Sequence, residues 1–110
     1  QPIKIDEWET ESFTAEQYAE AMEKMLSSDS LSYIMVSDTN NFVGADKLGD
    51  ADIQKLADMF KNATPTDKAD SSAERKHYMA VFEDGLIIKL AIVSEDYIEI
   101  PSKGVYFSVN

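Results

Sequence analysis

His77 is the only histidine of the 110-residue chain, so any Ser-His-Asp triad or histidine-bound metal would have to include it. It follows the charged run Glu74-Arg75-Lys76 and opens an apolar segment, which is a position typical of a polar boundary residue. No G-x-S-x-G pattern, the usual signature of a serine nucleophile at a sharp turn, accompanies it. We therefore interpret His77 as a structural or solvent-exposed residue.

Carboxylates are the second group that could do chemistry. Glu95, Asp96 and Glu99 lie close together in the sequence, and Glu83-Asp84 forms a second pair. Paired carboxylates can act as acid and base only where a cleft shifts the pKa of one of them. Both groups adjoin predicted hairpin turns, so we assign them to turn formation and to protection of strand edges. A hydrolase that uses carboxylates alone remains an alternative, and it would need a deep acidic cleft.

Metal and anion sites find little support in the pattern. Asp38-Thr39-Asn40 resembles the start of a calcium loop, but the next ligand position is Phe42 and Gly44 comes too late. An Asx-type turn explains this segment better. Ser102-Lys103-Gly104 lacks the glycine-rich strand-to-helix setting of a phosphate loop. The chain has no cysteine, which excludes thiolate zinc sites. We expect no catalytic residue, no metal and no cofactor, and hence no enzyme.

The last third of the chain predicts an antiparallel β-meander. Its four apolar segments are 77–82, 86–93, 97–100 and 105–109, and turn signals at 83–85, 94–96 and 101–104 separate them. Within 86–93 the even positions are all apolar, while Lys89 at an odd position must reach water. The even positions should therefore face the core.

An amphipathic helix is predicted over about 15–27. Thr14 and Gln17 have the spacing of a capping box, in which each side chain bonds the backbone N–H of the other residue. Phe13 and Tyr18 have the spacing of a hydrophobic staple.

A second helix is predicted over about 51–62. We expect Asp50 to cap it and Asn62 to end it in the left-handed conformation, with Pro65 preventing continuation. Between the two helices, Leu31–Ser37 predicts a strand, and Phe42–Ala45 is expected to return as its short partner.

These elements predict one α+β domain over residues 1–110, a two-layer sandwich with both helices on one face of the sheet. Residues 1–13 fit a short edge strand or ordered arm as well as a loosely held acidic leader, and the lone Trp8 should pin this segment to the body. Residues 64–74 are polar and without periodicity, so we interpret them as a mobile surface loop.

The charge of the chain narrows the classes of partner. Asp and Glu number 21 against 10 Lys and Arg, which gives a net charge of −11. Such an anion is repelled by nucleic-acid phosphates and anionic lipids, so we expect neither as a partner. It attracts a basic protein or peptide. No run of about 18 apolar residues is present, so we expect no membrane insertion of the domain.

From about residue 56 to 107 the pattern resembles a small uncharacterised domain of Gram-positive secreted and lipid-anchored surface proteins. The resemblance rests on Ala63-Thr64-Pro65-Thr66 with the polar loop after it, Tyr78-Met79-Ala80-Val81, the Gly85 turn, Tyr97-Ile98-Glu99-Ile100-Pro101 and Gly104-Val105-Tyr106. It implies an extracytoplasmic location, secreted or anchored to the surface of a bacterium. It implies no catalytic residue.

Together these features favour a non-enzymatic extracytoplasmic domain that binds a protein or peptide. The alternative is an acidic inhibitor or immunity-type protein that masks a basic toxin or enzyme. The expected contact surface is the uncovered sheet face, with Lys89, Tyr97, Glu99 and Tyr106, and with Lys103 beside the two tyrosines.

Overall fold

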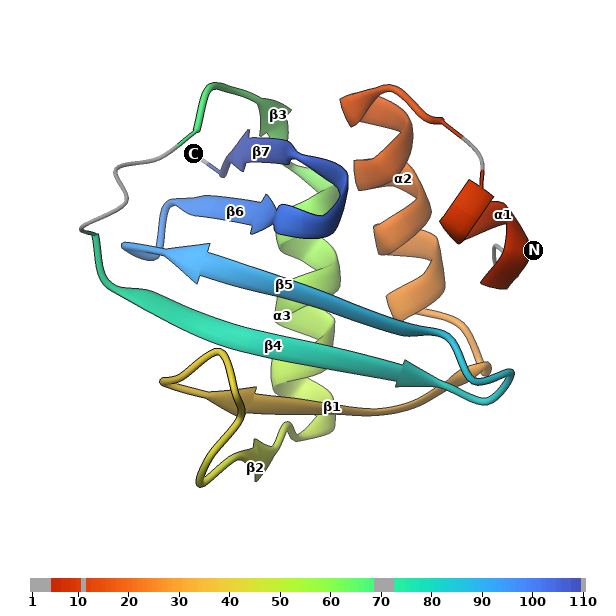
Figure 1. The fold of residues 1–110 in the computed structure, drawn as a ribbon, viewed down its shortest axis with the longest axis vertical. Coiled ribbons are helices and arrows are strands. Elements are labelled where there is room, and N and C mark those ends of the chain that lie inside the picture. Colours follow the sequence, from red (N-terminus) through yellow and green to blue (C-terminus); the bar gives the residue numbers. More distant parts are fainter. Residues whose placement is uncertain (1–4, 11, 69–72, 110) are drawn as a thin grey trace.

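The computed structural model describes residues 5–10, 12–68 and 73–109, and Figure 1 shows their arrangement. In chain order the described elements are α1 (Ile5–Thr10), α2 (Ala15–Leu26), β1 (Leu31–Ser37), β2 (Asp46–Lys47), α3 (Asp50–Lys61), β3 (Thr64–Pro65), β4 (Arg75–Phe82), β5 (Ile87–Val93), β6 (Tyr97–Ile100), the 3-10 turn η1 (Pro101–Lys103) and β7 (Val105–Ser108).

The seven strands form one antiparallel sheet in the order β2-β1-β4-β5-β6-β7-β3. Strands β4 to β7 are the predicted meander, each paired with the next along the chain. The turns follow their sequence signals: Asp84 Oδ1 accepts from the Leu86 amide at 3.1 Å, and Gly85 adopts a φ of +93°. The α+β architecture predicted from the sequence is confirmed.

Helices α2 and α3 lie side by side on one face of this sheet, and Figure 1 views the opposite face. The core lies between the two layers. Ile34, Ile88, Ile98 and Phe107 contribute from alternate strand positions and are at most 1% exposed. Phe60 of α3 meets Phe107 edge to face at 6.3 Å between ring centroids. Since side chains alternate along a strand, the neighbouring positions face away from the helices.

Helix α2 begins as the sequence predicts. The Gln17 amide donates to Thr14 Oγ1 at 3.2 Å, and the Thr14 amide donates to Gln17 Oε1 at 2.8 Å. These two bonds satisfy backbone donors that the first turn of a helix leaves without partners. Phe13 packs against Tyr18 with 5.2 Å between ring centroids, which confirms the hydrophobic contact around the cap.

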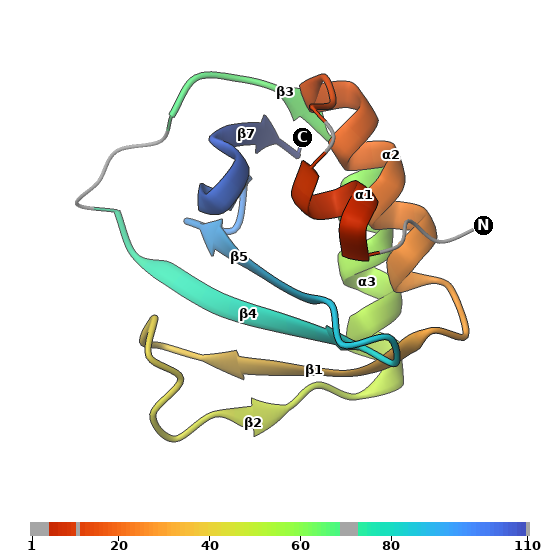
Figure 2. The ribbon, with the colours of Figure 1, turned by 45° about the vertical axis from the view of Figure 1, so that its right-hand side comes forward.

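Helix α1 replaces the edge strand that we considered for the first thirteen residues, of which residues 1–4 and 11 lie outside the described part. Helix α1 lies beside α2 (Figure 2). Trp8 is only 4% exposed, as expected, and meets Tyr18 edge to face at 5.3 Å between ring centroids. Its position shows that α1 packs against α2 through aromatic contacts.

Four predictions of local secondary structure are wrong, and two of them concern the ends of α3. Gly49 is the N-cap of α3 and Asp50 is the first helical residue, so Asp50 acts through its charge near the helix N-terminus. Asn62 ends the helix at a φ of −103°, outside the left-handed region. The strand partner of β1 is Asp46–Lys47, because residues 42–45 form a turn with positive φ at Phe42 and Gly44.

The fourth concerns residues 64–74. Thr64–Pro65 is strand β3 and pairs with the C-terminal strand, and the Thr66 amide donates to the Tyr106 carbonyl at 2.9 Å. Residues 69–72 of the predicted mobile loop lie outside the described residues.

Candidate functional site

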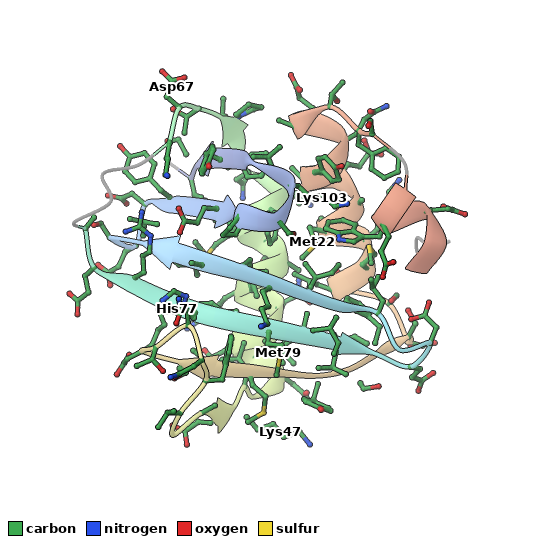
Figure 3. All side chains as sticks on the ribbon, viewed as in Figure 1. Met22, Lys47, Asp67, His77, Met79 and Lys103 are labelled. Carbon is green, nitrogen blue, oxygen red and sulfur yellow. The ribbon has the colours of Figure 1, made fainter. Side chains whose placement is uncertain are left out.

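On the sheet face opposite the helices, the strand register aligns the side chains of neighbouring strands in rows. One row contains Lys47, Met35, Met79 and Lys89. The next contains Ser37, His77, Ala91, Glu99 and Tyr106. A third contains Arg75, Val93, Tyr97 and Ser108. Figure 3 shows Lys47, His77 and Met79 on this side of the molecule.

All four residues expected to contact a partner lie on this face. Lys89 is exposed, Tyr97 is 36% exposed, and Tyr106 is half-buried beside Glu99. Glu99 differs from expectation, since only 7% of it is exposed. Whether these residues contact a partner stays a prediction.

Glu99 is buried because it forms an ion pair with Arg75. Arg75 Nε donates to Glu99 Oε1 at 2.7 Å, and Nη2 donates to Oε2 at 3.4 Å. A third donor, Nη1, bonds the Ala73 carbonyl at 2.9 Å. The pair joins β4 to β6 across the intervening strand β5. The β5 residue between His77 and Glu99 is Ala91, which has a small side chain. The side chains of Arg75 and Glu99 are 15% and 9% exposed, so this ion pair is largely shielded from water.

The loop between β1 and β2 is held by hydrogen bonds from short polar side chains. Ser37 Oγ, at the end of β1, donates to the Val43 carbonyl at 3.0 Å and accepts from the Thr39 amide at 3.2 Å. Asn41 Oδ1 accepts from the Thr39 hydroxyl at 2.6 Å and from the Val43 amide at 3.2 Å. The expected Asx-type turn is present, but Asn41 makes it in place of Asp38. These bonds hold Phe42 at a φ of +58°, which is strained for a residue with a side chain.

The fold of this loop borders a partly open cavity of about 480 Å³ on the sheet face. The ten lining residues are Asn40, Phe42, Arg75, His77, Lys89, Leu90, Ala91, Glu99, Pro101 and Ser102. Lys89 Nζ lies 5.9 Å from the centre of the Phe42 ring, in cation–π contact. The cavity thus combines contributions from the loop, three strands and η1, and its volume falls within the range of about 300–1,000 Å³ typical of ligand pockets.

Charge is distributed unevenly between the two sides of the protein. On the described strand positions of the open face, Lys47, Arg75 and Lys89 are cationic, and Glu99 alone is a carboxylate. Helices α2 and α3 together carry six carboxylates and three lysines. The described strand positions of the sheet face therefore carry three cations and one carboxylate, in contrast to the net charge of −11 of the whole chain.

The two exposed lysines of this face stack on aromatic rings. Lys47 Nζ lies 5.7 Å from the centre of the Tyr33 ring, and neither Lys47 nor Lys89 forms an ion pair with a carboxylate of the described residues. A cation without a counter-ion on an acidic protein is available to a partner's anion.

Lys103 lies elsewhere than expected. Its ammonium donates to the Trp8 carbonyl and stands 5.4 Å from the Trp8 ring centre and 5.9 Å from that of Tyr18. It therefore holds α1 against the body, at Trp8 and Tyr18, and not beside Tyr97 and Tyr106 as expected.

The predicted turn at 94–96 borders a second, more open hollow of about 830 Å³, lined in part by Ser94, Glu95 and Tyr78. Ser94 and Glu95 both have positive φ, at 52° and 67°, and the Asp96 amide closes the turn on the Val93 carbonyl at 3.3 Å. Burial, with a smaller contribution from the charge of Asp52, raises the pKa of Tyr78 above its usual value. The phenol of Tyr78 stays neutral and packs at the margin of the core.

The cavity residues that sequence reasoning missed include His77, Arg75 and Phe42. We interpreted His77 as structural or exposed, and it is half-buried in the wall of the cavity. Counting two residues back from His77 along the strand would have placed Arg75 on the same face. No signal in the sequence shows that Phe42 folds over that face, because this depends on the hydrogen bonds of the loop.

Within residues 5–10, 12–68 and 73–109, no group of three or more His, Asp and Glu side chains has the arrangement of a metal site. No helix in that part of the chain has the length and apolar character needed to cross a bilayer. No protein-family model, curated protein or solved structure matches the chain, so the case for its function rests on its own residues.

Proposed function

We propose that this chain is a non-enzymatic domain that binds a protein or peptide on the sheet face opposite the helices. One observation carries the proposal: α2 and α3 cover only one face of the sheet (Figure 1), and the other face exposes large apolar side chains. Ile87 is 52%, Tyr33 37% and Tyr97 36% exposed. Exposed aromatic and aliphatic side chains grouped on one face are typical of interaction surfaces.

The arrangement of this face suits recognition. Tyrosine offers a large apolar ring with a polar tip, and few rotatable bonds are fixed when it binds. The strands hold these side chains at fixed spacing, and the Arg75–Glu99 pair ties β4 to β6 beneath them. A partner therefore meets a surface that is already ordered, which reduces the entropy cost of association.

Site-specific photo-crosslinking tests the proposal. The photoreactive residue p-benzoylphenylalanine replaces Tyr97 on the sheet face in one variant and Gln54 on the exposed side of α3 in a matched variant. Each variant is irradiated with secreted and envelope proteins of the source organism, and adducts are identified by mass spectrometry. We expect one partner to be captured from Tyr97, and Tyr97→Ala or Ile87→Ser without the photoreactive residue to weaken its binding.

The two crosslinking positions separate the possible outcomes. Adducts at position 97 alone support binding on the sheet face. Adducts at position 54 alone would show that the helix layer is the contact surface and would overturn the proposal. If neither position captures a partner above the level seen without irradiation, the protein-binding proposal fails.

A second candidate is an acidic inhibitor or immunity-type protein that masks a basic toxin or enzyme. The observation that favours it is the exposed acidic surface of α2 and α3, with Glu16, Glu20, Asp52 and Asp58. Such a complex forms by electrostatic attraction, so its affinity falls steeply as salt rises. An affinity that does not change with ionic strength would exclude this candidate. So would an unchanged affinity in the double variant Asp52→Asn, Asp58→Asn.

We further propose that the domain works outside the cytoplasm, secreted or anchored to the surface of a bacterium. Its support is the resemblance of residues 56–107 to domains of Gram-positive surface proteins. Protease added to intact cells should then digest the protein, or the protein should appear in the medium. Full protection in intact cells together with absence from the medium would contradict this location.

A further inference from the structure

We propose that the cavity beside Lys89 receives a carboxylate of the bound partner, from an acidic side chain or from a free C-terminus. The proposal rests on the proposed function and names the chemistry of the ligand. The cavity lining contains two lysine or arginine cations and one carboxylate. Glu99 is already paired with Arg75, so the charge of Lys89 is the one left for a ligand.

Three polar groups of the lining complement a carboxylate. The Lys89 ammonium lies over the Phe42 ring and makes no ion pair with the described carboxylates. His77 and Asn40 line the same space, and each can donate an N–H. One lysine cation with further N–H donors suits a monovalent anion, and hydrogen bonds to charged groups are among the stronger ones in proteins.

The remaining walls favour a carboxylate on an apolar carrier. Phe42, Ala91 and Pro101 present carbon surface around the polar groups. A phosphate would bring close to two negative charges, and the described lining has a single uncompensated cation to meet them. An acidic residue next to an apolar one satisfies both kinds of wall.

The net charge of −11 does not prevent an acidic ligand from reaching this site. Most helix carboxylates lie on the other side of the sheet, and the molecule measures 24 Å along its shortest axis. At physiological salt the Debye length is about 8 Å, so charges on the far side are strongly screened. Lys89 is therefore the charged group of the cavity lining that no described carboxylate pairs.

Titrations of the full chain, followed by nitrogen–proton NMR, test the inference with defined probes. Acetyl-Phe-Glu-amide offers a side-chain carboxylate, acetyl-phenylalanine offers a terminal carboxylate, and acetyl-Phe-Gln-amide is the neutral control. We expect the acidic probes to shift the backbone amides of His77, Lys89 and Ala91. The Gln probe should bind at least about tenfold more weakly, a difference of about 1.4 kcal/mol. Comparison of the two acidic probes tells which source of carboxylate fits.

Two matched variants locate the effect. Lys89→Met keeps much of the apolar stem and removes the charge, and it should weaken the acidic probes at least about tenfold. Lys76→Met makes the same change of net charge on the helix side of β4 and should leave their affinity within about twofold. We expect both variants to keep the strand register, because the side chains of Lys76 and Lys89 are exposed and take no part in core packing.

Three results would each overturn the carboxylate inference: equal affinity for the Glu and Gln probes, an unchanged affinity in Lys89→Met, or no shifts with millimolar acidic probe. None of these outcomes affects crosslinking from Tyr97. If position 97 captures a partner while the acidic probes fail, the binding function stands and only the carboxylate inference falls. If crosslinking fails while the probes bind Lys89, the cavity takes carboxylates but the protein-binding function is wrong.

Discussion

Removal of the Glu99 carboxylate should destabilise the fold more than loss of any surface charge. The Arg75–Glu99 pair is only 15% and 9% exposed and is joined by contacts of 2.7 and 3.4 Å. In Glu99→Ala the Arg75 guanidinium stays in place and loses its ion pair with the Glu99 carboxylate. Breaking a buried pair by removing one partner costs about 3–5 kcal/mol, mainly because it leaves a buried charge uncompensated. We expect the lower value of about 3 kcal/mol, because Arg75 also bonds the Ala73 carbonyl.

That loss is large for a domain of this size. Domains are stable by about 5–15 kcal/mol, so Glu99→Ala removes between a fifth and more than half of the free energy of unfolding. At about 4 °C per kcal/mol the melting temperature should fall by about 12 °C. Urea denaturation followed by circular dichroism measures the free energy, and calorimetry measures the melting temperature.

Two comparisons isolate the ion pair as the cause. Glu74→Ala removes an exposed carboxylate next to Arg75 in the sequence and should change stability by less than about 0.5 kcal/mol. The double variant Arg75→Leu, Glu99→Leu leaves no buried charge and should recover most of the loss. The reasoning is refuted if Glu99→Ala unfolds within about 1 kcal/mol of wild type, or if the double variant is as unstable as the single one.

Three further substitutions test other contacts. Thr14→Ala removes the side-chain acceptor of the α2 capping box and should cost about 1 kcal/mol in urea denaturation. Lys103→Met removes the bond to the Trp8 carbonyl, so the fluorescence of this single tryptophan should shift to the red as α1 loosens. Burial and, to a smaller extent, the charge of Asp52 raise the pKa of Tyr78 in the folded state above the usual tyrosine pKa of about 10. The neutral phenol therefore contributes stability below about pH 10, and this contribution is lost as the pH rises toward the pKa of the folded state. The free energy of unfolding of Tyr78→Phe, measured relative to that of the wild type by urea denaturation, should therefore be higher at about pH 11 than at about pH 9.

The meander and α2 were predictable because their signals are local. Alternating apolar residues with Gly85 and the Asp84 side chain at the turn determine where β4 ends and β5 begins. Thr14 and Gln17 bond each other across three residues, so the start of α2 can be identified from four letters. Such interactions depend on no distant part of the chain.

The strand predicted at 42–45 is wrong because side-chain hydrogen bonds within the loop determine its path, and the loop predicted at 64–74 is wrong in part because a distant strand pairs with its first residues. Phe42 is turned by bonds among Ser37, Thr39 and Asn41, and the strand is displaced to Asp46–Lys47. Thr64–Pro65 becomes a strand because it meets the C-terminal strand, more than forty residues later in the sequence.

The candidate site was predictable as a face and not as a cavity. Period-two alternation places Lys89, Tyr97, Glu99 and Tyr106 on one side of the sheet. The burial of Glu99 follows from a partner 24 positions away, which local spacing does not reveal. Recognition of the pocket also requires the position of Phe42, and hence the fold of the whole β1–β2 loop.

The short strands at the two ends of the sheet determine how copies of this domain meet one another in a crowded solution. Pro65 on the β3 edge has no backbone N–H to offer a neighbouring strand, and β2 consists of the charged pair Asp46–Lys47. Where β1 extends beyond β2, the register of β1 with β4 shifts between Leu31 and Tyr33. Proline, charge and a bulge are three barriers against edge-to-edge pairing of sheets. Neighbouring copies therefore cannot readily extend each other's sheets into a fibre, and the broad sheet face remains accessible to a different molecule.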